Sequence, residues 1–334
     1  MKDSGVKDNR VAVIGAGAFG CSLALAFARA GRDVTLWGRD ASRMAAMTET
    51  RSCGEALPGV ALEAGITPTA NLALACHSGV IVAAIPTQSL GEVARAMAGR
   101  VPGDAAVISA AKGIERNTGA FVTDVLREAL GPHRFGVISG PSFAADVAKG
   151  LPTAISLAMP DGRHAEALAK RLSSAALRLY HTSDVRGVEI GGAAKNVLAI
   201  AAGIVSGMGL GESARAAMVT RGFAELRRYA GAFGAKPETL MGLSGLGDLV
   251  LTASSPQSRN YSLGQALGQG KALSEANPAG KLAEGVFTAA ILGQTARQHG
   301  IEMPIVEAVA QVLDGAISVG DAVRTLMTRP LRGE

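Results

Sequence analysis

The chain has 334 residues, of which 48% are hydrophobic, 18% are charged and 4% are aromatic. This length exceeds the usual size of one domain, and the hydrophobic content excludes an intrinsically disordered protein. The net charge of +5 comes from scattered basic residues without an aromatic-interleaved basic strip, so we expect no nucleic-acid partner and attribute the excess to a small anionic substrate or cofactor.

The first two-thirds of the chain alternates β-branched runs with alanine-rich segments. The predicted strands are Arg10–Ile14, Asp33–Trp37, Gly79–Ile85, Ala105–Ala110, Phe135–Ser139 and Thr153–Ala158. The predicted helices between them include Phe19–Ala30, Thr87–Ala98, Phe121–Leu130 and His164–Leu172. Such alternation indicates βαβ units and a parallel sheet, with ligands expected at the carboxyl ends of the strands.

From about Gly187 strand signals disappear and helical segments take over. The predicted helices are Gly192–Val205, Ser213–Phe233, Ser262–Leu267, Val286–Gln298, Pro304–Gly315 and Val319–Met327. We therefore expect an α/β fold with a Rossmann-type dinucleotide-binding domain over residues 1–190 and an all-α domain for substrate and catalysis over residues 191–334.

The stretch VAVIGAGAFG carries Gly15, Gly17 and Gly20 in the GxGxxG spacing, directly after a predicted strand and before a predicted helix. In that context the first glycine permits a tight turn, the second lets the backbone approach a pyrophosphate, and the third allows close helix–strand contact. The free N–H groups of the helix would bind the phosphates. The plain alternative is a turn rich in small residues.

The second predicted strand ends in VTLWGRD, which bears on the choice of nucleotide. Asp40 stands one position late for a carboxylate ligand of the adenosine ribose, whereas Arg39 is suited to pairing with a 2′-phosphate. NADPH is therefore acceptable to the site, and the relative use of NADPH and NADH stays open. Alternatively, Arg39 is a solvated turn residue.

Lys195 is the only ionisable residue between Glu189 and Glu212, within the small, apolar run GGAAKNVLAIAAGIVSGMGLG. An ammonium in a dry pocket can stabilise the negative charge that grows on a ketone oxygen during hydride transfer, and can then protonate it. Apolar surroundings and a second cation such as Lys112 would lower the pKa of Lys195, and Asp248 would oppose that shift. Alternatively, Lys195 extends to solvent from a buried helix.

Three further segments carry polar residues in glycine-rich contexts. They are AAKGIE with Lys112, SGPSFA with Gly140, Ser142 and Ala144, and GLSGLGDLVLTASSPQSRN with Asp248, Ser258, Arg259 and Asn260. The planar fork of Arg259 suits bidentate phosphate contact, and Ser258 and Asn260 add neutral donors. Alternatively, Asp248 is the N-cap of a following helix, and Arg259 lies in an exposed turn.

With these segments in this order after GAGxxG, the chain resembles the bacterial NAD(P)-dependent glycerol-3-phosphate dehydrogenases from Val11 to about Leu326. The resemblance implies reversible reduction of dihydroxyacetone phosphate to sn-glycerol 3-phosphate, a precursor of phospholipids, with NAD(H) or NADP(H). The chain departs from the family pattern at Ala18, where a serine is frequent. The missing hydroxyl removes at most one phosphate contact.

The resemblance also implies roles by position, with Lys195 as the catalytic residue. The implied substrate contacts are Lys112, Gly140, Ser142, Lys195, Asp248, Ser258, Arg259 and Asn260. Beside Gly15, Gly17 and Gly20, the implied nucleotide contacts are Ala18, Phe19, Arg39, Lys112, Ala144, Arg259, Leu282 and Glu284. Glu284 has the alternative role of a carboxylate at a helix N-terminus only.

Other features of the chain bound the remaining expectations. Cys21, Cys53 and Cys76 form no CxxC pair and the five histidines share no spacing, so we expect free thiols, a reducing compartment and no metal. The start MKDSGVKDNR has no apolar signal-peptide core, and we expect a cytoplasmic protein without membrane insertion. A homodimer through the helical domain is the expected oligomer.

Two other functions remain open on the sequence alone. One is a related two-domain dehydrogenase that acts on a hydroxy acid and also uses a catalytic lysine. The other is a nucleotide-binding module without turnover, for which Lys195 and Asp248 would be incidental.

Overall fold

The computed structural model describes residues 9–277 and 283–330, which fall into two compact units. The first unit comprises the chain up to Lys112 together with Ala120–Val185, and the second comprises Gly113–Gly119 together with the chain from Arg186 onward. Within the second unit, the Arg116 guanidinium lies 5.7 Å from the centroid of the Phe287 ring. The short segment Gly113–Gly119 therefore packs with the helices although it follows a strand of the sheet in sequence.

The first unit is built on an eight-stranded sheet in the order β3-β2-β1-β4-β5-β6-β7-β8. The strands are β1 (Arg10–Ile14), β2 (Asp33–Trp37), β3 (Ile66–Thr69), β4 (Val80–Ala83), β5 (Ala106–Ser109), β6 (Arg134–Ser139), β7 (Thr153–Ala158) and β8 (Leu177–Thr182). Neighbouring strands are parallel except β6 and β7, which run antiparallel. The order reverses between β1 and β4, and in open α/β sheets ligands bind at such a switch point.

All six predicted strands are present, and two more, β3 and β8, lie at the edges of the sheet. The sequence of β3, ITPT, contains Pro68, which argues against a central strand but is tolerated at an edge. In β8, Leu177 and Leu179 are buried while Arg178 and Tyr180 are exposed. This alternation is the signal that would have predicted β8.

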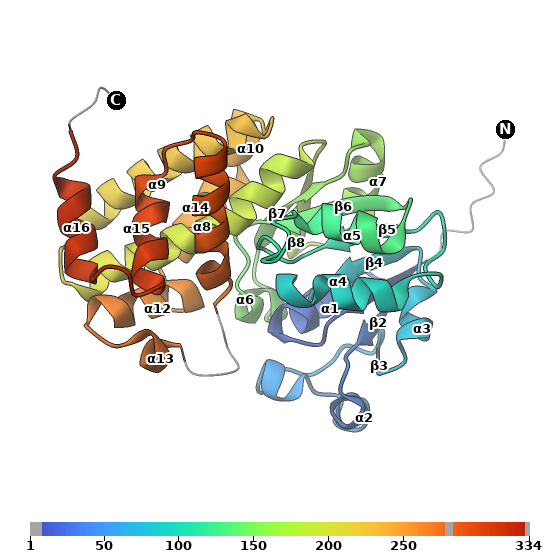
Figure 1. Ribbon diagram of the computed structural model, residues 1–334. Helices are drawn as coiled ribbons and strands as arrows, with labels where there is room; N and C mark the ends of the chain where they lie inside the picture. The colour runs from blue at the N-terminus through green and yellow to red at the C-terminus, as the bar shows by residue number, and fades with distance from the viewer. Residues whose placement is uncertain (1–8, 278–282, 331–334) are drawn as a thin grey trace. The chain divides into compact units, whose positions relative to one another are not determined.

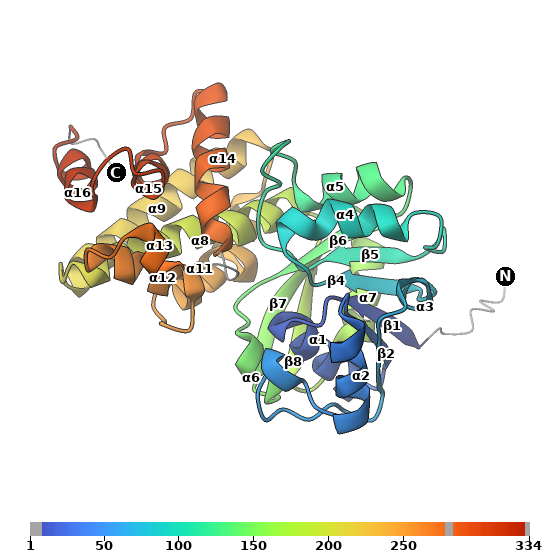
Figure 2. The same cartoon turned by 60° about the horizontal axis from the view of Figure 1, so that its bottom comes forward.

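Helices cover both faces of the sheet (Figures 1 and 2). They are α1 (Ala18–Arg29), α2 (Ala41–Thr50), α3 (Leu72–Cys76), α4 (Thr87–Met97), α5 (Val122–Leu130), α6 (Ala144–Ala148) and α7 (Gly162–Leu172). α4 packs against α5, α1 against α6, and α7 against β8. Side-chain caps from Asp40, Asn71 and Asp161 satisfy N–H groups at the starts of α2, α3 and α7.

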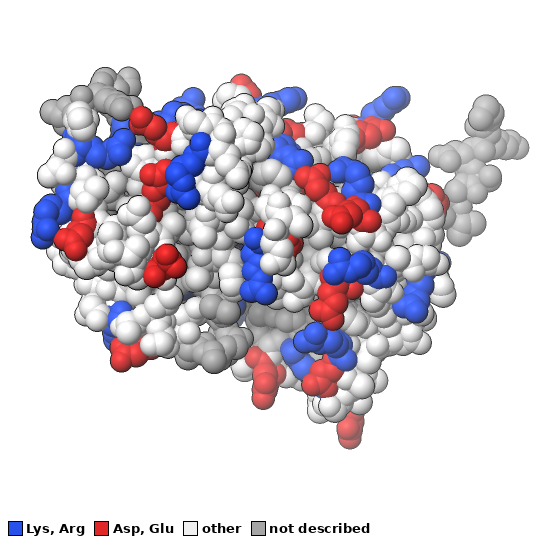
Figure 3. All heavy atoms as spheres, in the orientation of Figure 1, with Lys and Arg blue, Asp and Glu red and all other residues white. Residues whose placement is uncertain are grey.

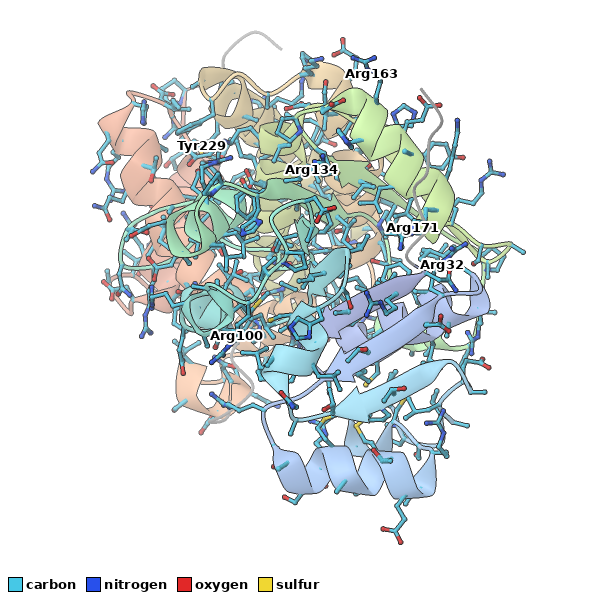
Figure 4. The ribbon with its side chains drawn as sticks, turned by 90° about the vertical axis from the view of Figure 1, so that its right-hand side faces the viewer. Arg32, Arg100, Arg134, Arg163, Arg171 and Tyr229 are labelled. Carbon is cyan, nitrogen blue, oxygen red and sulfur yellow. The ribbon has the colours of Figure 1, made fainter. Side chains whose placement is uncertain are left out.

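At the amino end of β1, two arginines bind polar groups of the chain. Arg32 and Arg171 lie near each other there (Figure 4). Arg32 donates to Oδ1 of Asn9 at 2.6 Å, and Arg171 donates to the Arg10 carbonyl at 3.4 Å. The glycine-rich loop lies at the opposite, carboxyl end of β1, so these two arginines belong to the scaffold.

The second unit is helical. Its elements are α8 (Val185–Gly207), α9 (Glu212–Ala232), α10 (Pro237–Met241), the π-helix η2 (Leu243–Gly247), α11 (Asp248–Thr252), α12 (Arg259–Gly268), α13 (Leu273–Ala276), α14 (Glu284–Gln298), α15 (Pro304–Leu313) and α16 (Val319–Met327). A parallel-dominated sheet with helices, followed by a helical unit, confirms the predicted fold class.

Helix α8 is longer than predicted and is buried from Gly187 to Val205. Its length and composition would suffice to cross a membrane, but its most apolar window is completely buried within the protein. A Cβ on Gly203 would lie 2.0 Å from the Tyr261 carbonyl oxygen, and one on Gly264 would lie 2.0 Å from the Ile200 carbonyl oxygen. The glycines therefore let the backbones of α8 and α12 touch, and this packing outweighs the low helix propensity of glycine.

Charges on the visible face of the molecule are of mixed sign. Lysine and arginine side chains there stand among aspartates and glutamates (Figure 3). Among the described residues, several oppositely charged side chains form exposed pairs one helical turn apart, such as Arg127 with Asp124 and Lys170 with Glu166. Such pairs contribute little stability, roughly 0–1 kcal/mol each. The buried charges are therefore the stronger candidates for a functional role.

Candidate active site

Lys195 lies in the middle of α8 and is 6% exposed. Its Nζ donates hydrogen bonds to Oδ1 of Asp248 at 2.6 Å and to Oγ1 of Thr252 at 2.9 Å. The alternative in which this lysine extends to solvent is therefore wrong. The ammonium is held inside the second unit by a carboxylate and a hydroxyl, which compensate its burial.

Asp248 and Thr252 are the first and last residues of α11, one helical turn apart. The Thr252 hydroxyl donates to Oδ1 of Asp248 at 3.2 Å, which closes a triangle with Lys195. Gly247 is the N-cap of α11, so the alternative of Asp248 as an N-cap is also wrong. The sequence analysis missed Thr252, although the i, i+4 spacing after Asp248 places both side chains on one helix face.

The triangle depends on a close approach at Gly191, one turn before Lys195 on α8. A Cβ at this position would lie 2.7 Å from the Ser244 carbonyl oxygen, so η2 packs directly on the helix backbone. Because α11 follows η2 without a break, this contact sets where Asp248 meets the ammonium. Gly191, the first of the two glycines before Lys195, thus has a packing role.

A second polar network lies beside Lys195, at Asn196. Nδ2 of Asn260 donates to Oδ1 of Asn196 at 3.0 Å, and Oδ1 of Asn260 accepts from the Gly285 N–H at 3.0 Å. Asn260 thereby ties the first turn of α12 to α8 and to the first turn of α14, where Glu284 is the first residue. Asn196 is a further member of the site that the sequence analysis did not assign.

The start of α12 presents an arginine next to this network. Ser258 is buried and caps the helix, since its Oγ accepts from the Tyr261 N–H at 3.2 Å. Arg259 is the first residue of the helix and is exposed. The arrangement therefore combines a capping serine with an exposed guanidinium at the first position of α12, so Arg259 is exposed as the alternative assumed but lies in a helix and not in a turn. Leu282 lies outside the described residues.

In the first unit, the glycine-rich loop has the geometry of a phosphate cradle. Gly15 has a φ of 120°, and its N–H donates to the Trp37 carbonyl at 2.8 Å. A Cβ on Gly20 would lie 1.7 Å from the Gly15 carbonyl oxygen, so only glycine fits there. Gly17 is the N-cap of α1 without a side-chain cap, and a Cβ on it would meet open space. The N-terminus of α1 therefore fits the pyrophosphate of a dinucleotide.

Four more predicted site residues gather at the carboxyl edge of the sheet. Lys112 Nζ donates to the Gly140 carbonyl at 3.0 Å and lies 5.6 Å from the centroid of the Phe19 ring. The Ser142 hydroxyl donates to the same carbonyl at 2.9 Å. Close by in sequence, Ala144 begins α6, which packs against α1, the helix that Ala18 begins.

Two arginines follow β2, Arg39 in the turn after the strand and Arg43 in the first turn of α2. Arg39 is exposed, and Asp40 caps α2 by accepting from the Arg43 N–H at 3.0 Å, a hydrogen bond that lowers the pKa of its carboxyl. Nη2 of Arg43 donates to the Ala16 carbonyl in the glycine-rich loop at 2.6 Å. Arg43 was missed from the sequence because only the fold brings α2 back to the loop.

The two units carry groups with different chemistry. The buried ammonium of Lys195 can stabilise and protonate a developing oxyanion. The glycine-rich loop can hold a dinucleotide through backbone N–H groups. In the ranges 9–277 and 283–330, no group of three or more His, Cys, Asp or Glu side chains is placed to hold a metal ion.

Both parts of the chain match models of one protein family. Residues 10–165 match the family described as NAD-dependent glycerol-3-phosphate dehydrogenase N-terminus, and residues 184–324 match the C-terminus of the same family. The glycerol-3-phosphate dehydrogenase (NAD(P)+) of Azorhizobium caulinodans is 56% identical over 326 residues, covering 98% of each chain. That of Methylobacterium radiotolerans is 53% identical over 323 residues, covering 96% of this chain and 97% of the relative.

Among solved structures, the glycerol-3-phosphate dehydrogenase of Coxiella burnetii superposes with a TM-score of 0.90 at 36% identity. The match covers 96% of this chain and 99% of that one. Both family matches, the curated relatives and this structure carry the name of the same enzyme family. The chain belongs to the NAD-dependent glycerol-3-phosphate dehydrogenase family.

Proposed function

We propose that the protein catalyses the reversible reduction of dihydroxyacetone phosphate to sn-glycerol 3-phosphate with NADPH or NADH, and so supplies the backbone of phospholipids. The observation that carries this proposal is the Lys195 ammonium, 6% exposed in an apolar helix and held by Asp248 and Thr252. The family membership of the chain gives the substrate, because its relatives are named for it.

The chemistry divides between the cofactor and the chain. A nicotinamide dinucleotide held at the glycine-rich loop would supply the hydride. Lys195 hydrogen-bonds the carbonyl oxygen of the substrate, stabilises the negative charge that develops there, and donates a proton to it; in the reverse direction it takes that proton back. Asp248 and Thr252 fix the position of Nζ, so little reorganisation is needed when the charge develops.

The first unit is the nucleotide-binding half in this proposal, and the second unit carries the catalytic lysine. Gly15, Gly17 and Gly20 bring backbone to the pyrophosphate, and Ala18 contributes its N–H alone. The other proposed nucleotide contacts are Phe19, Arg39, Lys112, Ala144, Arg259, Leu282 and Glu284. Beside Lys195, the proposed substrate contacts are Lys112, Gly140, Ser142, Asp248, Ser258, Arg259 and Asn260.

The direct test is oxidation of NADPH and NADH with dihydroxyacetone phosphate, compared with 2-oxo acids as substrates. We expect turnover with dihydroxyacetone phosphate, a fall of about 10³-fold or more in kcat for Lys195→Ala, and no change for Lys170→Ala. Lys170 is the matched control because it is an exposed lysine paired with Glu166. Preference for a 2-oxo acid would favour a hydroxy-acid dehydrogenase, and nucleotide binding without any turnover would favour a binding module.

Arg259 is proposed to bind the phosphate of the substrate, because it is an exposed guanidinium at the start of a ten-residue helix. Arg259→Ala should raise the KM for dihydroxyacetone phosphate by about tenfold or more, the value of a charge-assisted hydrogen bond. Arg259→Lys keeps the charge but loses the planar fork, so its KM for dihydroxyacetone phosphate should lie between those of the wild type and Arg259→Ala. An unchanged KM in the alanine variant would contradict the assignment.

Arg39 is proposed to bind the 2′-phosphate of NADPH, with Arg43 beside the glycine-rich loop as a second cation. Arg39→Ala should therefore raise the KM for NADPH several-fold, about 1 kcal/mol in binding, and leave the KM for NADH nearly unchanged. Steady-state kinetics with both cofactors measures this difference. Equal effects on the two cofactors would remove Arg39 from the 2′-phosphate site.

We also propose that the protein is cytoplasmic and forms a homodimer. Cys21, Cys53 and Cys76 are all free thiols, which fits the reducing cytoplasm. We infer a homodimer because twofold pairs are the commonest soluble oligomers. Light scattering on the purified protein measures the oligomeric state.

A further inference from the structure

The carbonyl group of Ala16, in the middle of the glycine-rich loop, accepts hydrogen bonds from two side chains. Nη2 of Arg43 donates to its oxygen at 2.6 Å, and the Cys21 thiol donates to the same oxygen at 3.5 Å. A guanidinium is a charged donor and a thiol is a weak one, so Arg43 holds the carbonyl more strongly. Ala16 is buried, and these bonds therefore satisfy an acceptor that water reaches poorly.

The first turn of α2 presents Arg43 to the loop. Oδ1 of Asp40 accepts from the Arg43 N–H at 3.0 Å, which fixes the start of the helix. The next residue, Met44, is buried, and a Cβ on Gly38 would collide with its sulfur and lie 3.1 Å from the Cβ of Ala16. The missing side chain at Gly38 thus lets Met44 pack close to the loop. Because the cap and this packing fix the backbone at Arg43, its guanidinium is held in place although the residue is exposed.

The Ala16 carbonyl belongs to the same peptide unit as the Gly17 N–H. This unit is planar and trans, so the N–H points in the direction opposite to the carbonyl. The bond from Arg43 on one side of the loop therefore fixes the direction of the Gly17 N–H on the other side. Gly17 is the N-cap of α1, no side chain caps that turn, and a Cβ on Gly17 would meet open space. The N–H that Arg43 orients thus lies where a phosphate group can approach the backbone.

We propose that Arg43 is a positioning residue of the nucleotide site, which fixes the Ala16–Gly17 peptide so that the Gly17 N–H faces the pyrophosphate. This role rests on the proposed function only in that the loop holds a dinucleotide. It differs from the role proposed for Arg39, which contacts the 2′-phosphate and so matters for NADPH alone. NADH has the same pyrophosphate and no 2′-phosphate, so Arg43 contributes to the binding of both cofactors.

Two simpler roles of Arg43 predict different results. If Arg43 acts only as a positive charge near the nucleotide, removing the charge of Arg39 instead should weaken NADH binding by a similar factor. If Arg43 serves only the stability of α2, its removal should lower the thermal unfolding midpoint and leave the affinity for NADH unchanged. The affinity for NADH, compared between variants of the two arginines, therefore separates the positioning role from both.

The test measures the dissociation constants of NADH and NADPH for the full chain, from the change in nicotinamide fluorescence on binding. We expect Arg43→Ala to raise the dissociation constant of NADH about fivefold or more, as for the loss of one hydrogen bond, and that of NADPH by at least the same factor. Arg43→Lys keeps a charged donor, so its dissociation constants should lie between those of the wild type and Arg43→Ala. Arg39→Ala is the charge-matched control and should leave the dissociation constant of NADH unchanged.

A second readout needs no ligand. Hydrogen–deuterium exchange of the peptide that spans the glycine-rich loop, measured without cofactor, should be faster in Arg43→Ala than in the wild type and unchanged in Arg39→Ala. The proposal is overturned if the loop of Arg43→Ala exchanges at the wild-type rate, if its dissociation constant for NADH is unchanged, or if Arg39→Ala raises that constant equally.

Neither readout depends on turnover, so the failure of this proposal differs from the failure of the proposed function. A wild type that binds NADH without reducing dihydroxyacetone phosphate would contradict the proposed function and leave the role of Arg43 standing. A wild type that binds neither cofactor would contradict both.

Discussion

Two long helices of the second unit, α8 and α9, each bury an ionisable side chain, and they compensate the charge differently. Lys195 on α8 meets the carboxylate of Asp248 and the hydroxyl of Thr252. Glu225 on α9 is 3% exposed and accepts hydrogen bonds from the backbone N–H groups of Ile305 at 2.9 Å and Val306 at 3.3 Å. Lys195 and Glu225 are therefore buried to a similar extent, but side chains hold the first and backbone N–H groups hold the second.

The partners indicate the role. Glu225 binds N–H groups in the first turn of α15 and so acts as a helix cap supplied by another helix, which serves structure. Lys195 is held by two side chains of α11 and not by backbone groups, which suits the proton donation that we propose for it. A buried charge is therefore a candidate catalytic group only when its partners leave it able to exchange a proton with a ligand.

The largest expected effect comes from removing the partner of Lys195. Asp248→Asn takes the carboxylate from a buried ammonium and should lower the free energy of unfolding by about 3–5 kcal/mol. The double variant Lys195→Met, Asp248→Asn removes the charge itself and should recover much of that loss. Urea denaturation of the two variants measures it. A double variant as unstable as the single one would mean that the pair is not coupled.

The next largest expected effect is a pH dependence of the free energy of unfolding that comes from Glu225. Burial raises the pKa of this carboxyl from 4.5 to about 7, against the hydrogen bonds from Ile305 and Val306. Because the folded state holds the proton more tightly, the group contributes most below pH 4.5, and its contribution falls by about 3 kcal/mol as the pH rises to about 7. Glu225→Gln should remove this fall while kcat stays near the wild-type value.

The measurement is the free energy of unfolding of wild type and Glu225→Gln across that range of pH. As the pH rises, the free energy of unfolding of the wild type should fall relative to that of Glu225→Gln. Glu238→Gln, at an exposed position on α10, is the control and should follow the wild type. A difference between wild type and Glu225→Gln that does not change with pH would contradict the account of Glu225.

The smallest effect compares one glycine of each helix. Gly203→Ala on α8 places a Cβ 2.0 Å from the Tyr261 carbonyl oxygen and should cost about 1–3 kcal/mol. Gly231→Ala on α9 meets nothing within 4 Å and should stabilise the protein by about 0.5–1 kcal/mol. The shift in the thermal unfolding midpoint of each variant measures these two effects. Equal shifts of the same sign would show that α8 does not depend on close packing with α12.

The fold was predictable where local patterns agree with packing. The strand before the glycine-rich loop and the second strand were predicted with the bounds that the structure shows, because β-branched runs end there in glycine turns. The start of α8 was placed seven residues late, since Gly191 and Gly192 disfavour a helix locally. Gly191 is needed for the contact with η2, which no local pattern contains.

The site was predictable in its residue types and less so in its connections. Lys195 and Asp248 were paired by expectation, and the structure places them 2.6 Å apart. Asn196 and Arg43 were missed because each acts through a partner distant in sequence, whereas Thr252 could have been found from its i, i+4 spacing after Asp248. The antiparallel turn from β6 to β7 was also missed, since the intervening connection carries only the five-residue helix α6 and does not cross over.

The central claim is that the amine at position 195 is the proton donor to the substrate oxygen. Chemical rescue tests it most directly, because Lys195→Ala leaves room for a small primary amine in a pocket that retains Asp248 and Thr252. Methylammonium should restore a saturable part of the reduction of dihydroxyacetone phosphate, with rates that follow the acidity of the amine across a series. A variant that binds NADPH and substrate normally but gains no activity from any amine would contradict the account.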